Sequence, residues 1–209
     1  MIICDDCLSV LPMLADGVAD LAWTDPPYNC GKDYGIYKDK LPEYEYLCNL
    51  DFVFDQLKRI ARARAVFTPQ KYKKKFWNML GSEFKEIILT YGPEGIKIKN
   101  DFVHQFATIL TDAKPVRYCK DVWHNCQMPA LGWYFNENSY GHPGYTSEDI
   151  TQKVIHNLSD KGTVIIDPYG GTLTTARAAK NLGRKYILIE INPDYCAIAK
   201  ERLAQEELF

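Results

Sequence analysis

The 209-residue sequence lacks two features that would place the protein at a membrane. No run of about 18 apolar residues is present, and the N-terminus has no resemblance to a signal peptide. The formal net charge is only −2, so overall charge favours neither a membrane nor a polyanion, and contact with a nucleic acid would require a local basic patch. We therefore expect a cytoplasmic protein with no membrane partner.

The cysteines do not form the even set of a disulfide framework. Seven of them are scattered along the chain, which is typical of reduced thiols in a cytoplasm. Cys4 and Cys7 have the spacing of half a zinc site, and Cys119, His124 and Cys126 are the candidate partners. These last three lack the tight pairing of zinc motifs, so we favour small buried thiols and expect no metal.

Length and composition indicate a single α/β domain. With 46% hydrophobic residues, 209 residues provide one full core and leave little room for a second. Short apolar segments typical of strands alternate with amphipathic stretches typical of helices. We predict seven strands, and they lie near Ile2, Leu21, Val66, Ile87, Thr108, Val164 and Ile187. A helix is expected from about Phe52 to Ala61, and a loop from Cys30 to Tyr46.

The stretch that ends at Tyr28 is the first one in the chain that indicates a functional site. An apolar strand runs into Asp25, Pro26, Pro27 and Tyr28. The prolines have no N–H group and fix their φ angles, so the loop is stiff and a carbonyl beside the Asp25 carboxylate stays available. Two such acceptors can hold the two N–H donors of an exocyclic amine, and Tyr28 would stack on its ring. A proline-stiffened turn capped by Asp25 is the structural alternative.

Residues 162–190 form the second informative stretch. A buried strand ends at Asp167, a glycine turn leads into a helix from Thr174, and a further strand ends at Glu190. This order, with an acid about twenty residues after the turn, is that of an adenosine-binding unit in which the acid suits ribose hydroxyls. Leu173 stands where a phosphate-binding turn would need another small residue. The turn therefore favours a cofactor without phosphates, such as S-adenosylmethionine.

Asp25 to Tyr28, at the end of a strand, resembles the catalytic motif of the S-adenosylmethionine-dependent amino-methyltransferases, most of which act on DNA. The residues around it also look like that family, as does the glycine turn, and the resemblance spans nearly the whole chain. These supporting residues are Asp6-Cys7-Leu8 to Leu14, Asn29, Gly31 to Gly35, and Asp167 to Thr172. The resemblance implies that Asp25 and the Pro26 carbonyl hold the target amine while Tyr28 stacks on the flipped base.

The resemblance also implies a fold. We expect a single three-layer, Rossmann-like methyltransferase domain over residues 1–209, with a seven-stranded, mostly parallel sheet. The strand near Thr108 would be the one antiparallel strand. Because the catalytic strand precedes the cofactor strand, the order is that of a circularly permuted member. The two blocks would then lie on adjacent central strands and meet at one crevice.

A cofactor site follows from the same resemblance. Its expected residues are Asp5, Asp6, Thr146, Ser147, Asp167, Tyr169, Gly170, Gly171, Thr172, Thr174, Glu190 and Asn192. Asp6 would contact the adenine of the cofactor, or cap the helix that follows it, or do both. Two positions depart from the family pattern. Thr146 and Ser147 replace a segment that contains a lysine, and Leu173 replaces a glycine and is expected to crowd the site.

Nucleic-acid contacts are expected from two segments. The Cys30–Tyr46 loop follows the catalytic motif, and its candidate contacts are Lys32, Tyr34 and Tyr37. Positive charges without an intervening acid predict a phosphate-facing surface at Lys71, Lys73, Lys74 and Lys75, with a solvated helix face as the alternative. Residues 122–145 occupy the place of the family's recognition segment but are too few for a separate domain.

The sequence thus predicts a site-specific DNA methyltransferase that transfers a methyl group to adenine N6 of a flipped base. Asp rather than Ser at position 25 favours adenine. Cytosine N4, RNA or a protein amide as the target, and an inactive nucleic-acid-binding subunit of the same fold, are the alternatives. Expected partners are DNA, a second copy in a homodimer, and a cognate restriction enzyme.

Overall fold

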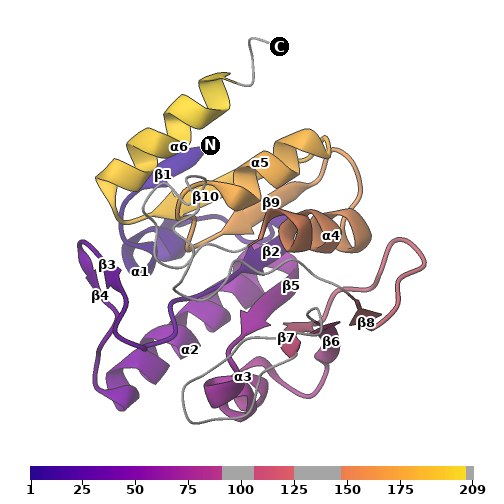
Figure 1. Ribbon diagram of the computed structural model, residues 1–209, viewed down its shortest axis with the longest axis horizontal. Helices are drawn as coiled ribbons and strands as arrows, with labels where there is room; N and C mark the ends of the chain where they lie inside the picture. Colours follow the sequence, from indigo (N-terminus) through magenta and orange to yellow (C-terminus); the bar gives the residue numbers. More distant parts are fainter. Residues whose placement is uncertain (91–105, 125–146, 206–209) are drawn as a thin grey trace.

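The computed structural model describes residues 1–90, 106–124 and 147–205, and these form a sheet with helices on both faces (Figure 1). Helices α4, α5 and α6 cover one face, and α1, α2 and α3 cover the other. The predicted three-layer α/β architecture is confirmed.

The central sheet contains all seven predicted strands and one more. Its strands are β1 (Ile2–Cys4), β2 (Ala19–Thr24), β5 (Ala61–Thr68), β6 (Lys85–Thr90), β7 (Phe106–Thr111), β8 (Val122–Trp123), β9 (Val164–Asp167) and β10 (Lys185–Glu190). They lie in the order β1-β10-β9-β2-β5-β7-β6-β8. Only β7 runs antiparallel to its neighbours, as expected for the strand near Thr108. The additional strand, β8, is two residues long and pairs with β6, too short for its alternation to be detected in the sequence.

The helical segments are α1 (Cys7–Val10), the 3-10 turn η1 (Leu11–Met13), α2 (Glu43–Ile60), the 3-10 turn η2 (Gln70–Tyr72), α3 (Lys73–Leu80), α4 (Glu148–Leu158), α5 (Thr174–Asn181) and α6 (Pro193–Gln205). Helix α2 begins at Glu43, well before the predicted Phe52. Its first turns are polar on the outside and bury only Tyr46 and Leu50, so their helical period was hard to read. No helix in the described ranges is both long and apolar enough to span a bilayer.

The prediction of a loop from Cys30 to Tyr46 is also wrong in part. This segment contains a hairpin of β3 (Asp33–Tyr34) and β4 (Tyr37–Lys38), followed by the first turn of α2. Each strand is only two residues long, so neither has a period that the sequence could reveal. The hairpin lies beside the carboxyl edge of the central sheet, where it reaches the cavity described below.

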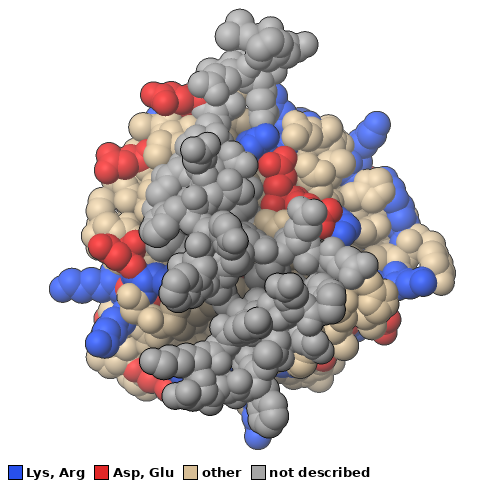
Figure 2. Space-filling model, in the orientation of Figure 1, with Lys and Arg blue, Asp and Glu red and all other residues tan. Residues whose placement is uncertain are grey.

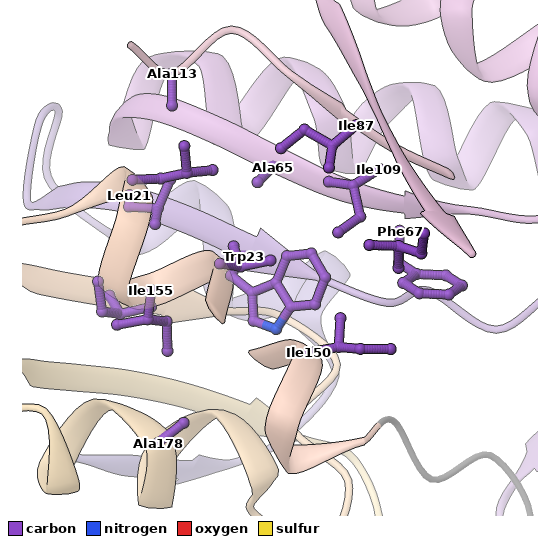
Figure 3. Close-up of a cluster of buried hydrophobic side chains, with 14 of the residues drawn as sticks. Leu21, Trp23, Ala65, Phe67, Ile87, Ile109, Ala113, Ile150, Ile155 and Ala178 are labelled. Carbon is purple, nitrogen blue, oxygen red and sulfur yellow. The ribbon is translucent and has the colours of Figure 1, made fainter. Parts of the chain in front are cut away.

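The largest core cluster fixes β2 in the middle of the molecule. Trp23 on β2 is 1% exposed and meets the ring of Phe67 on β5 edge to face, with 6.5 Å between ring centroids. Ile150 and Ile155 of α4 pack against the same face (Figure 3). Burial of each such side chain contributes roughly 1.5–3 kcal/mol. A strand anchored in this way holds the loop at its carboxyl end in a defined place.

Adjacent parallel strands bring the two informative blocks to one edge. Leu21 and Ala22 of β2 pair with Ile165 and Ile166 of β9, so both strands end at the same side of the sheet. β10 continues the sheet beside β9, and β1 follows β10. The carboxyl ends of four neighbouring strands therefore carry Asp25, Asp167, Glu190 and the Asp5-Asp6 pair. The predicted meeting of the two blocks at one crevice is confirmed.

Candidate active site

A cavity at the carboxyl edge of the sheet is bordered by both blocks. Of the predicted catalytic residues, Asp25 and Pro27 line it, whereas Pro26 and Tyr28 are not among its described lining residues. Pro26 is buried, and the Tyr28 hydroxyl donates a hydrogen bond to Asp25 Oδ1. The ring of Tyr28 packs against the main core cluster. Tyr28 therefore holds the Asp25 carboxylate, and its stacking on a target base stays a prediction.

The cofactor turn is built from glycines and one buried acid. A Cβ atom at Gly170 would lie 2.3 Å from Leu188 Cγ, so only glycine fits there. Gly171, at φ +51°, donates its N–H to Glu190 Oε2 over 2.7 Å, and the Asn192 N–H donates to Glu190 Oε1 over 2.8 Å. Burial raises the pKa of Glu190, and these amide contacts oppose the rise. The turn and the end of β10 are thus tied together around one carboxylate.

Asp167, at the end of β9, is the most deeply buried acid of the cavity. It accepts hydrogen bonds from Thr175 Oγ1 (2.5 Å) and the Tyr169 N–H (3.0 Å). Burial, together with the charges of Asp25 and Glu190, raises its pKa to about 7 against the effect of these bonds. Asp167 therefore changes charge near neutral pH.

The charges around the cavity indicate which ligands it suits. Its described lining residues include four carboxylic acids and no lysine, arginine or histidine, and the acids are Asp6, Asp25, Asp167 and Glu190. A phosphate would be repelled by this set, whereas a cationic sulfonium would be attracted. The residues present thus fit S-adenosylmethionine, as the sequence predicted, and not a nucleotide cofactor.

Most predicted cofactor residues border the cavity, but three do not. Asp6, Asp167, Tyr169, Gly170, Gly171, Thr172, Thr174 and Glu190 line it. Asp6 also caps α1 by accepting the Leu8 N–H, so both of its predicted roles are compatible with the structure. Asp5, Ser147 and Asn192 are outside the lining, and Thr146 is outside the described residues.

The structure shows where the side chains of Asp5, Ser147 and Asn192 lie instead. Asp5 is exposed at the end of β1. Ser147 precedes α4 but makes no side-chain cap. Asn192 donates from Nδ2 to the Tyr34 carbonyl over 3.1 Å and accepts the Asp194 N–H at Oδ1, which links the hairpin to α6. The cofactor contact of Asn192 stays a prediction, and the link between the hairpin and α6 was not evident from sequence position alone.

Leu173 does not crowd the cavity. It is fully buried among Ala176, Leu188 and Ala199, on the side that faces α6. Its φ is +91°, in the left-handed region that normally requires glycine. The backbone strain of a leucine at this position is offset by apolar burial, and the turn keeps the shape that a glycine would allow.

The predicted nucleic-acid residues fall in different surroundings. Tyr34 and Tyr37 of the hairpin line the cavity, and burial raises the pKa of both, that of Tyr37 to about 12. Both hydroxyls therefore stay protonated and can donate hydrogen bonds at neutral pH. Lys32 is half-buried, and its backbone N–H is directed at Asp39.

The positive charge of the run from Lys71 to Lys75 is partly neutralised in the folded structure. Lys73 pairs with Glu86 of β6, Lys75 pairs with Glu43 of α2, and Lys71 lies 4.7 Å from the centre of the Tyr72 ring. Figure 2 shows basic and acidic side chains interspersed on the face in view. Acids distant in the chain therefore neutralise two of the four charges, which the sequence pattern did not reveal.

Sequence reasoning missed several residues that border the cavity. Cys7, Asn49, Thr175 and Ile191 are among them. Asn49 lies on α2 between the predicted loop, which ends at Tyr46, and the predicted helix, which begins near Phe52, so no helical pattern pointed to it. Burial raises the pKa of Cys7 to about 12, so its thiol stays protonated. In the described part of the chain no three potential metal ligands are grouped, and Cys126 of the weighed zinc set lies outside that part.

A family model for DNA methylases matches residues 19–201. The chain belongs to the N6/N4 DNA methylase family. Type II methyltransferase M.HpaI of Haemophilus parainfluenzae is 29% identical over 98% of this chain and 74% of its own. DNA adenine methyltransferase YhdJ of Escherichia coli K12 is 24% identical over 97% of this chain and 82% of its own.

Solved structures agree with the fold. M1.HpyAVI in complex with S-adenosylmethionine superposes with a TM-score of 0.70 at 19% identity, covering 97% of this chain and 98% of that one. The cytosine-N4-specific PvuII DNA methyltransferase superposes with a TM-score of 0.70 at 17% identity, and the match covers 95% of this chain and 84% of that one. The predicted resemblance is confirmed at the level of the family, since the family model and the relatives are DNA methyltransferases and the solved neighbours share the fold.

Proposed function

We propose that this DNA methylase transfers a methyl group to the N6 amine of adenine at a specific site in DNA. The observation that carries the proposal is the shared cavity of the Asp25–Pro27 loop and the Glu190 turn. A target amine held at the first would face a cofactor held at the second. Asp25, rather than serine, and the adenine specificity named for YhdJ favour adenine over cytosine.

The target amine would be held by acceptors of the catalytic loop. The Asp25 carboxylate and the Pro26 carbonyl accept its two N–H groups and direct the nitrogen lone pair away from the base ring. The Tyr28 hydroxyl, which donates to Asp25 Oδ1, orients that carboxylate. Rate acceleration then comes from proximity and alignment of the amine, and the base must be flipped out of the duplex to reach the loop.

The cofactor would be held by the glycine turn and its acids. S-adenosylmethionine, when bound, supplies an electrophilic methyl group on a sulfonium. Glu190 accepts from the ribose hydroxyls with the lone pairs that Gly171 and Asn192 leave available, and Asp6 reaches the adenine. The carboxylates around the cavity stabilise the positive charge before transfer.

Cytosine N4 is the second candidate target. Its exocyclic amine has the same two N–H donors, so the acceptors of the Asp25 loop would suit it equally. The PvuII enzyme of similar fold is named as cytosine-N4-specific. We further propose a homodimer and a cognate restriction enzyme as partners, because residues 122–145 leave little chain for sequence recognition.

Methyl incorporation tests the proposal. The protein is incubated with labelled S-adenosylmethionine and duplex DNA of mixed sequence, and the product is digested to nucleosides. Label in N6-methyladenine that disappears with Asp25→Ala supports the proposal. Label in N4-methylcytosine would select the second candidate. Label found only in RNA or protein, or no label despite cofactor binding, would contradict both.

A further inference from the structure

Four consecutive backbone amides after the catalytic tetrapeptide all donate to one residue, Asp39. The Asn29 N–H donates to Asp39 Oδ1 over 2.7 Å, and the Cys30 and Lys32 N–H groups donate to Oδ2 over 3.1 Å each. The intervening Gly31 N–H donates to the Asp39 main-chain carbonyl over 2.6 Å. The segment therefore curls around a single acceptor residue, as in an anion-binding nest.

The Asp39 side chain has one further donor among the described residues, the Cys30 thiol, which donates to Oδ2 over 3.4 Å. Asp39 is 1% exposed, and it takes part in none of the salt bridges among the described residues. A buried carboxylate without donors would be strongly unfavourable, so the amides of the segment stabilise the carboxylate and the carboxylate orders the segment. The two depend on each other.

Asn29 closes the same loop from its other side. Its side chain donates from Nδ2 to the Leu41 carbonyl over 2.9 Å and accepts the Leu41 N–H over 2.7 Å. Its φ of +52° belongs to the left-handed region, which asparagine tolerates better than most residues. The segment 29–41 is thus a closed loop that leaves the catalytic tetrapeptide at one end and enters α2 at the other.

This loop borders the cavity and adjoins the catalytic tetrapeptide. Asn29 directly follows Tyr28, whose hydroxyl holds Asp25, and the hairpin within the loop presents Tyr34 and Tyr37 to the same cavity. Asp39 itself does not line the cavity. Its contribution to chemistry must therefore be indirect, through the backbone that it orders.

We propose that Asp39 is a positioning residue for methyl transfer: it holds residues 29–32 so that Asp25, Tyr28 and the hairpin tyrosines keep a reactive arrangement. The proposal rests on the proposed methyltransferase function. Because misplacement by about 1 Å can cost about 100-fold in rate, the effect should appear in kcat. The KM for S-adenosylmethionine should change little, since the cofactor turn is held by other contacts.

Two substitutions and a matched control test the role kinetically. D39A removes all four side-chain contacts, three with backbone amides and one with the Cys30 thiol, and should lower kcat by about 100-fold. D39N keeps the size of the side chain and one acceptor oxygen, and it should lower kcat by about tenfold. The prediction therefore includes a smaller loss of kcat for D39N than for D39A. Asp51→Asn, at an exposed position on α2, removes the same charge and should leave kcat unchanged.

Amide hydrogen exchange tests the physical step separately, on the full-length protein. Peptides covering residues 26–34 should exchange faster in D39N than in the wild type, while peptides of β10 should be unaffected. Unchanged exchange, or faster exchange with an unchanged kcat, would overturn the positioning role and leave the proposed function intact. A wild-type protein with no transferase activity would overturn the proposed function, and exchange would still show whether Asp39 orders the loop.

Discussion

The two sides of the cavity are held together in different ways. On the cofactor side, the turn from Asp167 to Thr172 lies between a strand and a helix, and Asp167 accepts from residues two and eight positions later. On the target side, the loop after β2 is held by Asp39 and by the Tyr46 hydroxyl, which donates to the Pro27 carbonyl over 3.0 Å. The cofactor side is held by carboxylates at the ends of two sheet strands, Asp167 and Glu190, whereas the target side is held by side chains that lie outside the central sheet.

This difference suggests that substitutions on the two sides of the cavity affect different measurable quantities. Changes on the cofactor side should alter affinity for S-adenosylmethionine, because the contacts there shape the binding turn. Changes on the target side should alter the rate of transfer, because the contacts there orient the amine acceptor. Substitutions that affect both quantities equally would show that the two sides act as one unit.

The largest effect is expected for Asp25→Asn. The amide keeps the size of the side chain but replaces one acceptor oxygen with a donor that opposes the target amine. We expect kcat to fall on the order of 100- to 1000-fold with the cofactor dissociation constant unchanged. Single-turnover transfer and a calorimetric titration measure the two quantities. A parallel loss of cofactor binding would assign Asp25 to the cofactor site.

Glu190→Gln should produce the opposite pattern. Both carboxylate oxygens accept backbone amides, so a glutamine NH2 group would face one N–H donor and disturb the turn. We expect cofactor affinity to fall roughly 10- to 100-fold, as for loss of a hydrogen bond to a charged group. Transfer at saturating cofactor should be largely retained. Unchanged affinity in the titration would contradict the ribose assignment.

Tyr46→Phe should have a smaller effect, confined to the target side. The substitution removes only the hydroxyl that holds the Pro27 carbonyl, and Tyr46 is otherwise 1% exposed and well packed. Loss of one such hydrogen bond is expected to lower kcat by roughly 2- to 10-fold. Tyr118→Phe, at a position that is 95% exposed, is the matched control. Equal kcat values for the two variants would show that the Tyr46 hydroxyl does not help to position the catalytic loop.

Asp167→Asn should change the pH dependence of stability rather than the rate. Burial raises the pKa of Asp167 from 3.8 to about 7, so between these values the folded chain binds a proton that the unfolded chain has lost. Its contribution to stability is present below the unfolded value and is lost as the pH rises through about 7. The wild type should lose stability relative to Asp167→Asn between about pH 4 and pH 8 in urea titrations, whereas a constant difference would contradict the raised pKa.

The sequence was most informative where function depends on short contiguous patterns. Asp25 and Pro27 were found because a strand followed by a stiff acidic loop is recognisable, and Gly170, Gly171 and Glu190 because strand, turn and helix follow in order. Asp39 and Tyr46 carry no pattern of their own. Their contacts with Asn29 and Pro27 depend on how the chain returns after the hairpin, which no local period encodes.

The contacts that the sequence did not reveal have the same origin. Asn192 adjoins a cofactor acid in sequence, but its side chain is directed at the hairpin carbonyl of Tyr34. The lysine run looked unopposed because Glu43 and Glu86, which pair with Lys75 and Lys73, come from other elements. Leu173 was expected in the cavity, yet its backbone turns the side chain toward α6. In each case side-chain direction decided the outcome.

What the sequence determined by itself was the succession of strands, turns and acids along the chain, including the stiff loop at Asp25 and the glycine turn before Thr174. Periodicity and turn composition are local, so they can be read from residues that are neighbours in the chain. Only the tertiary structure decided which groups are neutralised, which residues face the cavity and what holds the catalytic loop. Those depend on distances between segments, because buried charges and amides take partners from wherever the fold brings them.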